Sequence, residues 1–154
     1  MTIEAKLRQM GWELPDPPKP VASYVPCVRT GNLLFVSGQV PRAKGVLKYS
    51  GHLGREHTVE EGQQAARICA LNGLSAVKQA VGSLDRIRRI VKLTGYVASA
   101  AGFTDQPMVI DGASVFLVEL FGELGQHARA AVGVSELPLG SAVELEMIVE
   151  VEPE

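Results

Sequence analysis

One cation and two carboxylates near the end of the chain have residue types and a spacing that suit the binding of a small acid. Arg129 is flanked by alanines, which leave space around its long side chain. Glu144 and Glu146 follow fifteen and seventeen residues later, at positions of one parity in the next strand-like run. A guanidinium matches a carboxylate in bidentate geometry. Two interpretations are therefore open: an Arg–Glu pair across partnering strands, or a pocket for a small carboxylate in which one Glu positions water.

Other chemistry-bearing motifs are missing from the sequence. It has no GxxxxGK[ST], HExxH, CxxC or GxSxG segment, and Ser37-Gly38 has no His–Asp context for a serine nucleophile. The three histidines, His52, His57 and His127, lack the paired spacing of metal ligands. We interpret them as solvated residues of loops and element ends, and we expect neither a metal nor a cofactor.

Five stretches have the composition or alternation of strands. Residues 23–28 and 33–37 flank Thr30-Gly31-Asn32, a pattern that predicts a hairpin. The further predicted strands are 87–98, 128–135 and 143–151, with a short one at 46–49. The last long strand alternates strictly between apolar and mostly acidic residues, so one of its faces is predicted to be polar.

Two segments have apolar residues at the helical period. Thr58 and Glu61 form a capping-box pattern that begins one helix, and Gly82 follows its end. The second helix is predicted to begin near Pro107, with its firm part at 113–124. Gly62 and Gly73 are eleven residues apart, three helical turns, so we expect both to face the sheet closely.

The chain divides into an N-terminal piece and one main domain. Residues 1–20 contain a short predicted helix, Thr2 to Met10, and four prolines between positions 15 and 20, which predict an extended arm. Residues 21–154 form the domain. Its element order predicts an α+β fold: a single mixed sheet of about six strands with two helices packed on one face. The other sheet face is expected to be a self-association surface with a polar centre.

Composition excludes several classes of function. The 154 residues carry a net charge of −2, which argues against a chain that coats nucleic acid. A small basic cluster, with Arg86, Arg88, Arg89 and Lys92, is interpreted as a solvated strand edge. No apolar run approaches membrane-spanning length and no secretory pattern opens the chain, so we expect no membrane contact. Two isolated cysteines indicate a reducing, cytoplasmic location.

Two blocks of sequence resemble one known family. Residues 128–132 (ARAAV), Leu137-Pro138 and residues 143–147 (VELEM) resemble the C-terminal signature of the RidA/YjgF family of reactive-intermediate deaminases, also labelled endoribonuclease L-PSP. Residues 31–41 (GNLLFVSGQVP) resemble the family's N-terminal segment. The similarity covers roughly residues 21–151, and the first 20 residues look like an extension found in a sub-branch.

The resemblance implies a fold, an assembly and an activity. The fold would be chorismate-mutase-like and the assembly a homotrimer with three clefts between subunits. The activity would be the hydrolysis of imine and enamine acids, such as 2-aminoacrylate, to 2-oxo acids and ammonia. Arg129 would hold the substrate carboxylate and Glu144 would orient water. Tyr24, Ser37 and Gly38 would line the cleft from the adjacent subunit.

Three positions depart from the family pattern. His127 replaces the usual proline, Ala131 replaces a residue with a thiol, and the asparagine that begins the family's second helix corresponds to Asp111 or Gly112. A carboxylate at Asp111 would repel an acidic substrate unless Arg129 screened it. Two alternatives to a deaminase therefore stay open: a non-catalytic binder of small carboxylate metabolites, and an endoribonuclease-type member.

Overall fold

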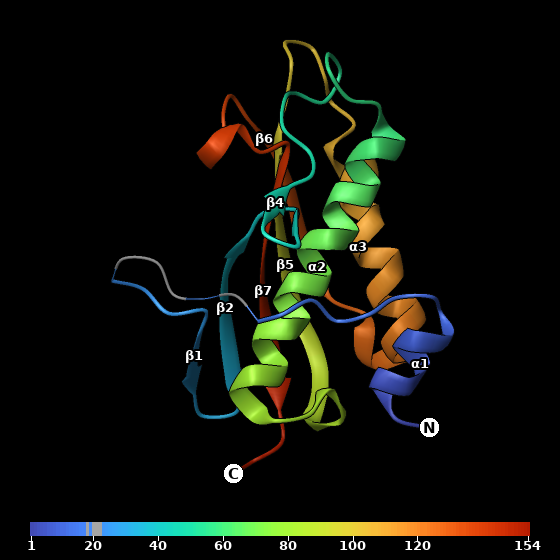
Figure 1. Ribbon diagram of the computed structural model, residues 1–154, viewed down its shortest axis with the longest axis vertical. Helices are drawn as coiled ribbons and strands as arrows, with labels where there is room; N and C mark the ends of the chain where they lie inside the picture. The colour runs from blue at the N-terminus through green and yellow to red at the C-terminus, as the bar shows by residue number, and fades with distance from the viewer. Residues whose placement is uncertain (18, 20–22) are drawn as a thin grey trace.

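The structure, a computed structural model, describes residues 1–17, 19 and 23–154. The end of the predicted proline-rich arm and the start of the predicted domain at residue 21 fall on residues 18 and 20–22, outside the described residues. The fold is an α+β arrangement of one mixed sheet with helices on one face (Figure 1). This confirms the predicted fold class.

The main sheet has five strands in the order β1-β2-β7-β5-β6. Its members are β1 (Cys27–Thr30), β2 (Leu33–Gln39), β7 (Val143–Val151), β5 (Ile87–Ala98) and β6 (Ala128–Val134). Only β5 and β6 pair in parallel, which makes the sheet mixed. The predicted short strand near 46–49 forms β4 (Val46–Leu47), but it pairs with β3 (Arg42–Ala43) in a separate ribbon, so the main sheet has fewer strands than expected.

Two long helices, α2 (Val59–Val81) and α3 (Gln106–Phe121), cover one face of the sheet. The predicted capping box is confirmed at the start of α2, where Thr58 and Glu61 each bind the other's backbone N–H. Gly82 ends that helix with a left-handed φ of 92°, which glycine adopts without strain. The described residues also form three short 3₁₀ turns: η1 (Leu84–Arg86), η2 (Gly122–Gly125) and η3 (Pro138–Gly140).

The two mid-helix glycines of α2 serve different contacts. A Cβ on Gly73 would lie 2.8 Å from the Met147 methyl group on β7, so this glycine does face the sheet. A Cβ on Gly62 would instead meet Leu53 and Val109 of α3, at 2.7 and 3.0 Å. The prediction of one shared sheet-facing side is therefore wrong for Gly62, which allows α3 to approach α2.

The N-terminal segment packs against the helix layer. The predicted short N-terminal helix is α1 (Ile3–Gln9); it buries Leu7 beside α3 and η1, and the Thr2 side chain caps its first turn. Trp12 lies edge-on to Phe116 of α3, with the Arg67 guanidinium 4.9 Å from its ring centroid. Figure 1 shows α1 near the lower end of α3 and the following chain crossing in front of α2.

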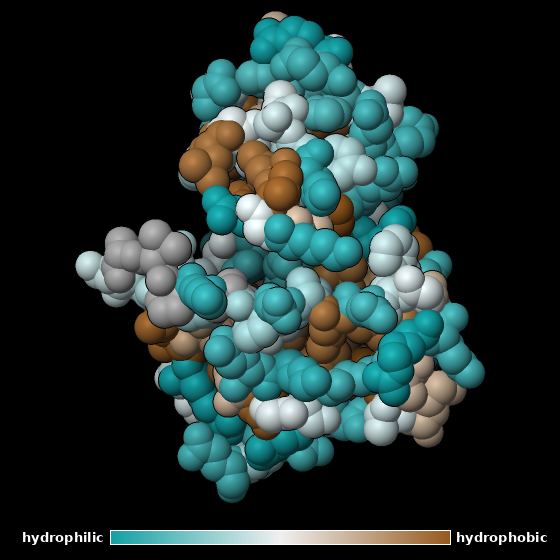
Figure 2. Space-filling view, in the orientation of Figure 1, coloured by the Kyte–Doolittle hydropathy of each residue, from teal (hydrophilic) through white to brown (hydrophobic). Residues whose placement is uncertain are grey.

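No helix of the described residues lies over the opposite face of the sheet. On β7 buried residues alternate with half-buried ones, and Glu144, Glu146 and Glu150 belong to the second set, as the sequence predicts. Exposed apolar side chains of β1, β2 and β6 share the uncovered side or its edges: Val28, Phe35 and Val132. Figure 2 shows the other side of the molecule, with α2 in front of the sheet; that surface is mostly hydrophilic, with hydrophobic residues near η3 and β4, where Leu139 and Val46 are exposed.

Candidate functional site

Arg129 lies at the start of β6, the edge strand, on the face that α3 covers. Its backbone is in register with buried Leu93 of β5. One guanidinium nitrogen, Nη1, donates to Asp111 Oδ1 of α3 at 2.7 Å and to Ser114 Oγ, one helical turn on, at 3.2 Å. About a quarter of the Arg129 side chain is exposed (24%), and nearly half of the Asp111 side chain (47%). The cation is therefore held from the helix side and open on the other.

The remaining edge of the Arg129 guanidinium is free to bind a ligand. Both protons of Nη1 are used by Asp111 and Ser114. Within the described ranges, Nε and Nη2 of Arg129 make no hydrogen bond. These two nitrogens form the side-on edge that accepts a carboxylate in bidentate fashion. The geometry thus leaves one carboxylate-binding edge beside an exposed carboxylate.

His127 and Ser114 fix the direction of a short hydrogen-bond chain behind Arg129. His127 Nδ1 lies 2.6 Å from the Gly125 carbonyl, which only accepts, so Nδ1 carries a proton. With this tautomer Nε2 of His127 accepts from Ser114 Oγ at 2.9 Å, and Ser114 in turn accepts from Arg129. The sequence-based view of His127 as a solvated histidine is wrong, because the residue is half-buried and both of its ring nitrogens are hydrogen-bonded.

The predicted cross-strand pair between Arg129 and the glutamates of β7 does not form. Strand β5 lies between β6 and β7, so the two are not partners. Arg129 also points to the helix-covered face, whereas Glu144 and Glu146 share the open face with their β5 partners Tyr96 and Thr94. The sequence is compatible with β6 beside β7 and with β5 between them, because the alternation of residues along one strand does not reveal which strand is its neighbour.

Glu144 lies on the open face near the start of β7, against the backbone of β2. A Cβ on Gly38 would be 3.0 Å from both Cδ and Oε2 of Glu144, so glycine at this position makes room for the carboxyl group. Burial, and then the negative charge of Glu146, raise the pKa of Glu144 above its ordinary value. Glu144 is therefore a carboxyl group that holds its proton to higher pH than a solvated glutamate.

Tyr96 and Glu146 form a polar pair next to Glu144 that sequence reasoning missed. The Tyr96 hydroxyl donates to Glu146 Oε1 at 2.7 Å, and this bond raises the pKa of Tyr96. Glu146 also lines a pocket of about 330 Å³ on the open face, together with Ser37, Thr94, Lys92 and several apolar side chains. The alternation of residues 92–96 could have indicated this polar surface from the sequence, because it places Lys92, Thr94 and Tyr96 on one face of β5.

Of the remaining predicted site residues, Ser37 and Ala131 fall on the same two faces, whereas Tyr24 lies before the first strand of the sheet. Ser37 lines the open-face pocket, and its hydroxyl donates to the Val25 carbonyl at 2.7 Å, which leaves its oxygen lone pairs to accept. Tyr24 precedes β1 and is 56% exposed. Ala131 shares the helix-facing side of β6 with Arg129, opposite Gly95 of β5. One chain therefore gathers Ser37, Gly38 and Glu144 on one side, and Arg129, Asp111 and Ala131 on the other.

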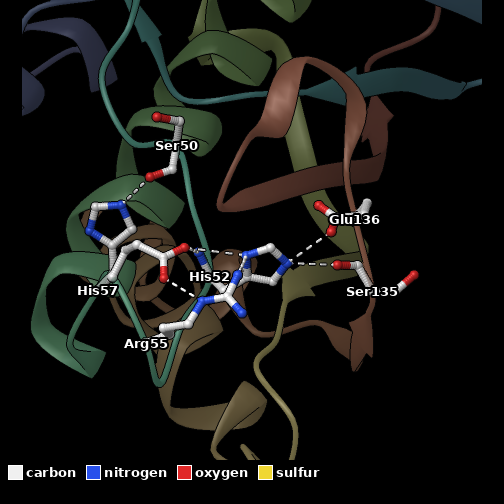
Figure 3. A network of polar contacts seen from close by, with 7 residues as sticks. Ser50, His52, Arg55, His57, Ser135 and Glu136 are labelled. Carbon is white, nitrogen blue, oxygen red and sulfur yellow. Dashed lines mark hydrogen bonds and ion pairs between the residues drawn. The ribbon is translucent and has the colours of Figure 1, made fainter.

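A second polar cluster joins the loop before α2 to the turn after β6 (Figure 3). His52 Nε2 donates to the Ser135 carbonyl at 2.8 Å, while its Nδ1 accepts from Arg55. The Ser135 carbonyl is the main cause of the raised pKa of His52; Glu56 and Glu136 raise it further, and Arg55 lowers it. The Arg55 guanidinium holds the pKa of Glu56 at about 2. The side chains of His52 and His57 are only 14% and 15% exposed, and both are hydrogen-bonded. The prediction that these two histidines are solvated is therefore wrong.

Comparison with known proteins decides the family. The family model described as "YjgF/chorismate mutase-like, putative endoribonuclease" matches residues 4–151. The chain belongs to the YjgF family. Protein TCP17 of Trypanosoma cruzi is 46% identical over 149 residues, which are 96% of this chain and 93% of that protein. A 2-iminobutanoate/2-iminopropanoate deaminase of Dermatophagoides farinae is 30% identical over 138 residues, 90% of this chain and 93% of that protein.

A solved relative has the same fold. The crystal structure of the protein Atu1372 from Agrobacterium tumefaciens superposes with a TM-score of 0.92 at 46% identity, and the match covers 97% of this chain and 92% of that one. The chorismate-mutase-like YjgF fold expected from the sequence is therefore confirmed. No helix in the described part of the chain is long and apolar enough to cross a membrane. No cluster of three or more metal-ligating side chains occurs among the residues described.

Within this YjgF fold, Asp111 and Gly112 have distinct environments. A Cβ on Gly112 would lie 2.1 Å from the Gln63 carbonyl oxygen of α2, so position 112 has no space for a side chain. Asp111 instead reaches Arg129. Of the two candidates for the family's asparagine position, only Asp111 can place a polar group beside the arginine.

Proposed function

We propose that the protein hydrolyses 2-imino acids and their enamine tautomers to 2-oxo acids and ammonia, at clefts formed between copies of the chain. The free Nε/Nη2 edge of Arg129 is the observation that carries this proposal, because it suits the carboxylate common to these substrates. The deaminase of Dermatophagoides farinae, at 30% identity, supports the same reaction class.

The proposal requires a second copy, because Arg129 and Glu144 are on opposite faces of one sheet. Strand β6 is an edge strand with a free side, and Val132 on it is 43% exposed. Met108 and Val115 on the neighbouring helix α3 are exposed as well. Such an apolar edge is normally covered. We infer that it packs on the open sheet face of a second copy, and that three copies close a ring in which each cleft takes Arg129 from one chain and Glu144, Ser37, Gly38 and Tyr24 from the next.

In such a cleft the chemistry needs few groups. Arg129 binds the carboxylate and orients the neighbouring C=N carbon. Glu144, as carboxylate, accepts a proton from water while the water oxygen bonds to that carbon and the C=N π electrons move to nitrogen. The same carboxyl group returns that proton to nitrogen, which gives the carbinolamine. Glu144 then takes the hydroxyl proton as the C=O bond forms and the C–N bond breaks, and it passes this proton to the departing nitrogen, so that imino acid plus water gives 2-oxo acid plus ammonia. The raised pKa of Glu144 suits a group that both accepts and returns a proton.

The test is the hydrolysis of freshly generated 2-iminobutanoate, followed by ammonia release against the rate in buffer alone. The wild-type protein should accelerate the release, and Arg129→Ala should abolish the acceleration. Arg88→Ala, which changes an exposed arginine on β5, serves as the matched control and should retain the wild-type rate. A wild-type rate equal to that in buffer refutes the proposal. If 2-oxobutanoate then still raises the melting temperature, the protein is a non-catalytic binder of small carboxylates.

A further inference from the structure

The positive charge of Arg129 is partly neutralised by Asp111, so this site differs from one in which an arginine alone binds an anion. Asp111 Oδ1 is 2.7 Å from Arg129 Nη1, so the cation already has an anionic partner. A second partner of the same nitrogen, Ser114, is neutral. The net charge presented to a ligand is therefore near zero, and a monoanion gains less from this pair than from a lone guanidinium.

Asp111 has a further oxygen to offer. Only its Oδ1 makes a hydrogen bond within the part of the chain that the structure describes, and nearly half of the side chain is exposed. Met108 and Val115, on the same side of α3 one turn before and after Asp111, are exposed and apolar. A carboxylate oxygen bordered by apolar side chains binds a cation more strongly than one in open water. The site thus offers an anion-binding edge and a cation-binding oxygen side by side.

We propose that Asp111 is a specificity-determining residue that selects ligands with a protonated nitrogen next to their carboxylate. In a 2-iminium acid the carboxylate would lie on the Nε/Nη2 edge of Arg129, and the positive nitrogen would face Asp111 Oδ2. Ligands with the same carboxylate but no adjacent positive charge would be disfavoured by the negative charge of Asp111. This inference rests on the proposed role of Arg129 as the carboxylate anchor and adds the charge state of the substrate.

Ser114 provides the control for this inference. Asp111 and Ser114 both contact Nη1 of Arg129, but only Asp111 carries charge. Asp111→Asn keeps the shape and removes the charge. Ser114→Ala removes a contact to the same nitrogen and leaves every charge in place. A residue that only positions Arg129 would affect all carboxylate ligands alike, as Ser114 should.

The probes are (S)-2-aminobutanoate and (S)-2-hydroxybutanoate, which share a carbon skeleton and differ in a cationic or neutral group at C2. Their dissociation constants for the full-length protein are measured by calorimetry at pH 7.5. Wild type should prefer the amino acid roughly threefold or more, the scale of a partly exposed ion pair. Asp111→Asn should remove or reverse that preference by strengthening the hydroxy acid and weakening the amino acid, whereas Ser114→Ala should weaken both and keep the ratio.

Two outcomes overturn the inference: equal weakening of both acids by Asp111→Asn, or no binding of the amino acid by wild type. Neither probe is an imine, so the binding ratio is independent of turnover. A protein that shows the charge preference but releases no ammonia contradicts the proposed deaminase activity alone. A protein that releases ammonia and shows no Asp111-dependent preference contradicts only the role of Asp111.

Discussion

Arg129 and Glu144 project from opposite faces of the same sheet, with strand β5 between their strands. Arg129 meets helix α3 through Asp111, and Glu144 meets the backbone of β2 at Gly38. No rotation of either side chain brings the two groups together within one chain, because the sheet separates them. Any chemistry that uses both residues therefore requires two chains.

Mixing of two inactive variants tests that requirement. Arg129→Ala and Glu144→Gln should each lack deaminase activity, and oligomers assembled from an equal mixture after unfolding and refolding should regain it. If each cleft in a closed ring takes one group from each of two neighbours, random mixing restores about a quarter of the sites. The ammonia-release rate of the mixture measures this fraction. A mixture that stays as inactive as its two components, while wild type treated in the same way regains its rate, contradicts a cleft shared between two chains.

Alanine at Gly38 should reduce activity more than stability. The added Cβ would lie 3.0 Å from the Glu144 carboxyl, which is the movable end of a side chain, so the carboxyl shifts and the fold is retained. We expect kcat to fall about tenfold or more for a displaced catalytic carboxyl group. Gly62→Ala is the contrast, because its Cβ would press on buried Leu53 and Val109. That variant should lose roughly 1–3 kcal/mol of stability to overpacking and keep kcat. The reverse pattern would contradict both assignments.

The pH dependence of stability should report the raised pKa of Glu144. A carboxyl group whose pKa is higher in the folded than in the unfolded protein favours folding when protonated. Wild type should therefore lose stability relative to Glu144→Gln as pH rises from the unfolded value of about 4.3 through the folded pKa, with a constant difference above it. Denaturant unfolding at pH 4 and pH 8 measures this. A wild type that gains stability relative to the glutamine variant over that range would show that ionised Glu144 is stabilising.

His52 should stabilise the loop before α2 in the opposite pH direction. Its pKa is raised in the folded state, chiefly by the Ser135 carbonyl, so protonated His52 favours folding. The contribution is fully present below the unfolded pKa of about 6.5 and disappears as pH rises through the folded pKa. The melting temperature of His52→Gln should thus fall below that of wild type by more at pH 6 than at pH 8.5. An unchanged difference across this range would exclude titration of His52 as the cause.

Local order in this protein was readable from its sequence. The capping box at Thr58, the end of α2 at Gly82 and the alternation on β7 each depend on contacts within a few residues, and all three are as predicted. The two sequence blocks around Ser37 and Arg129 likewise sufficed to indicate the YjgF family. Helix capping and strand alternation depend on residues that are close together in the sequence, so they can be predicted without knowing how the rest of the chain folds.

The arrangement of the site was decided only by the tertiary structure. Strand β6 has small residues on both faces, so its sequence does not reveal which face meets the helices or which strand lies beside it. The pairing of Arg129 with Asp111, the support from Ser114 and His127, and the separation of Arg129 from Glu144 all follow from that long-range choice. Strand order results from packing across the whole core, where Gly112 lets α3 approach α2 closely. The sequence determined which groups the protein carries, and the packing of its helices on the sheet determined which of them meet.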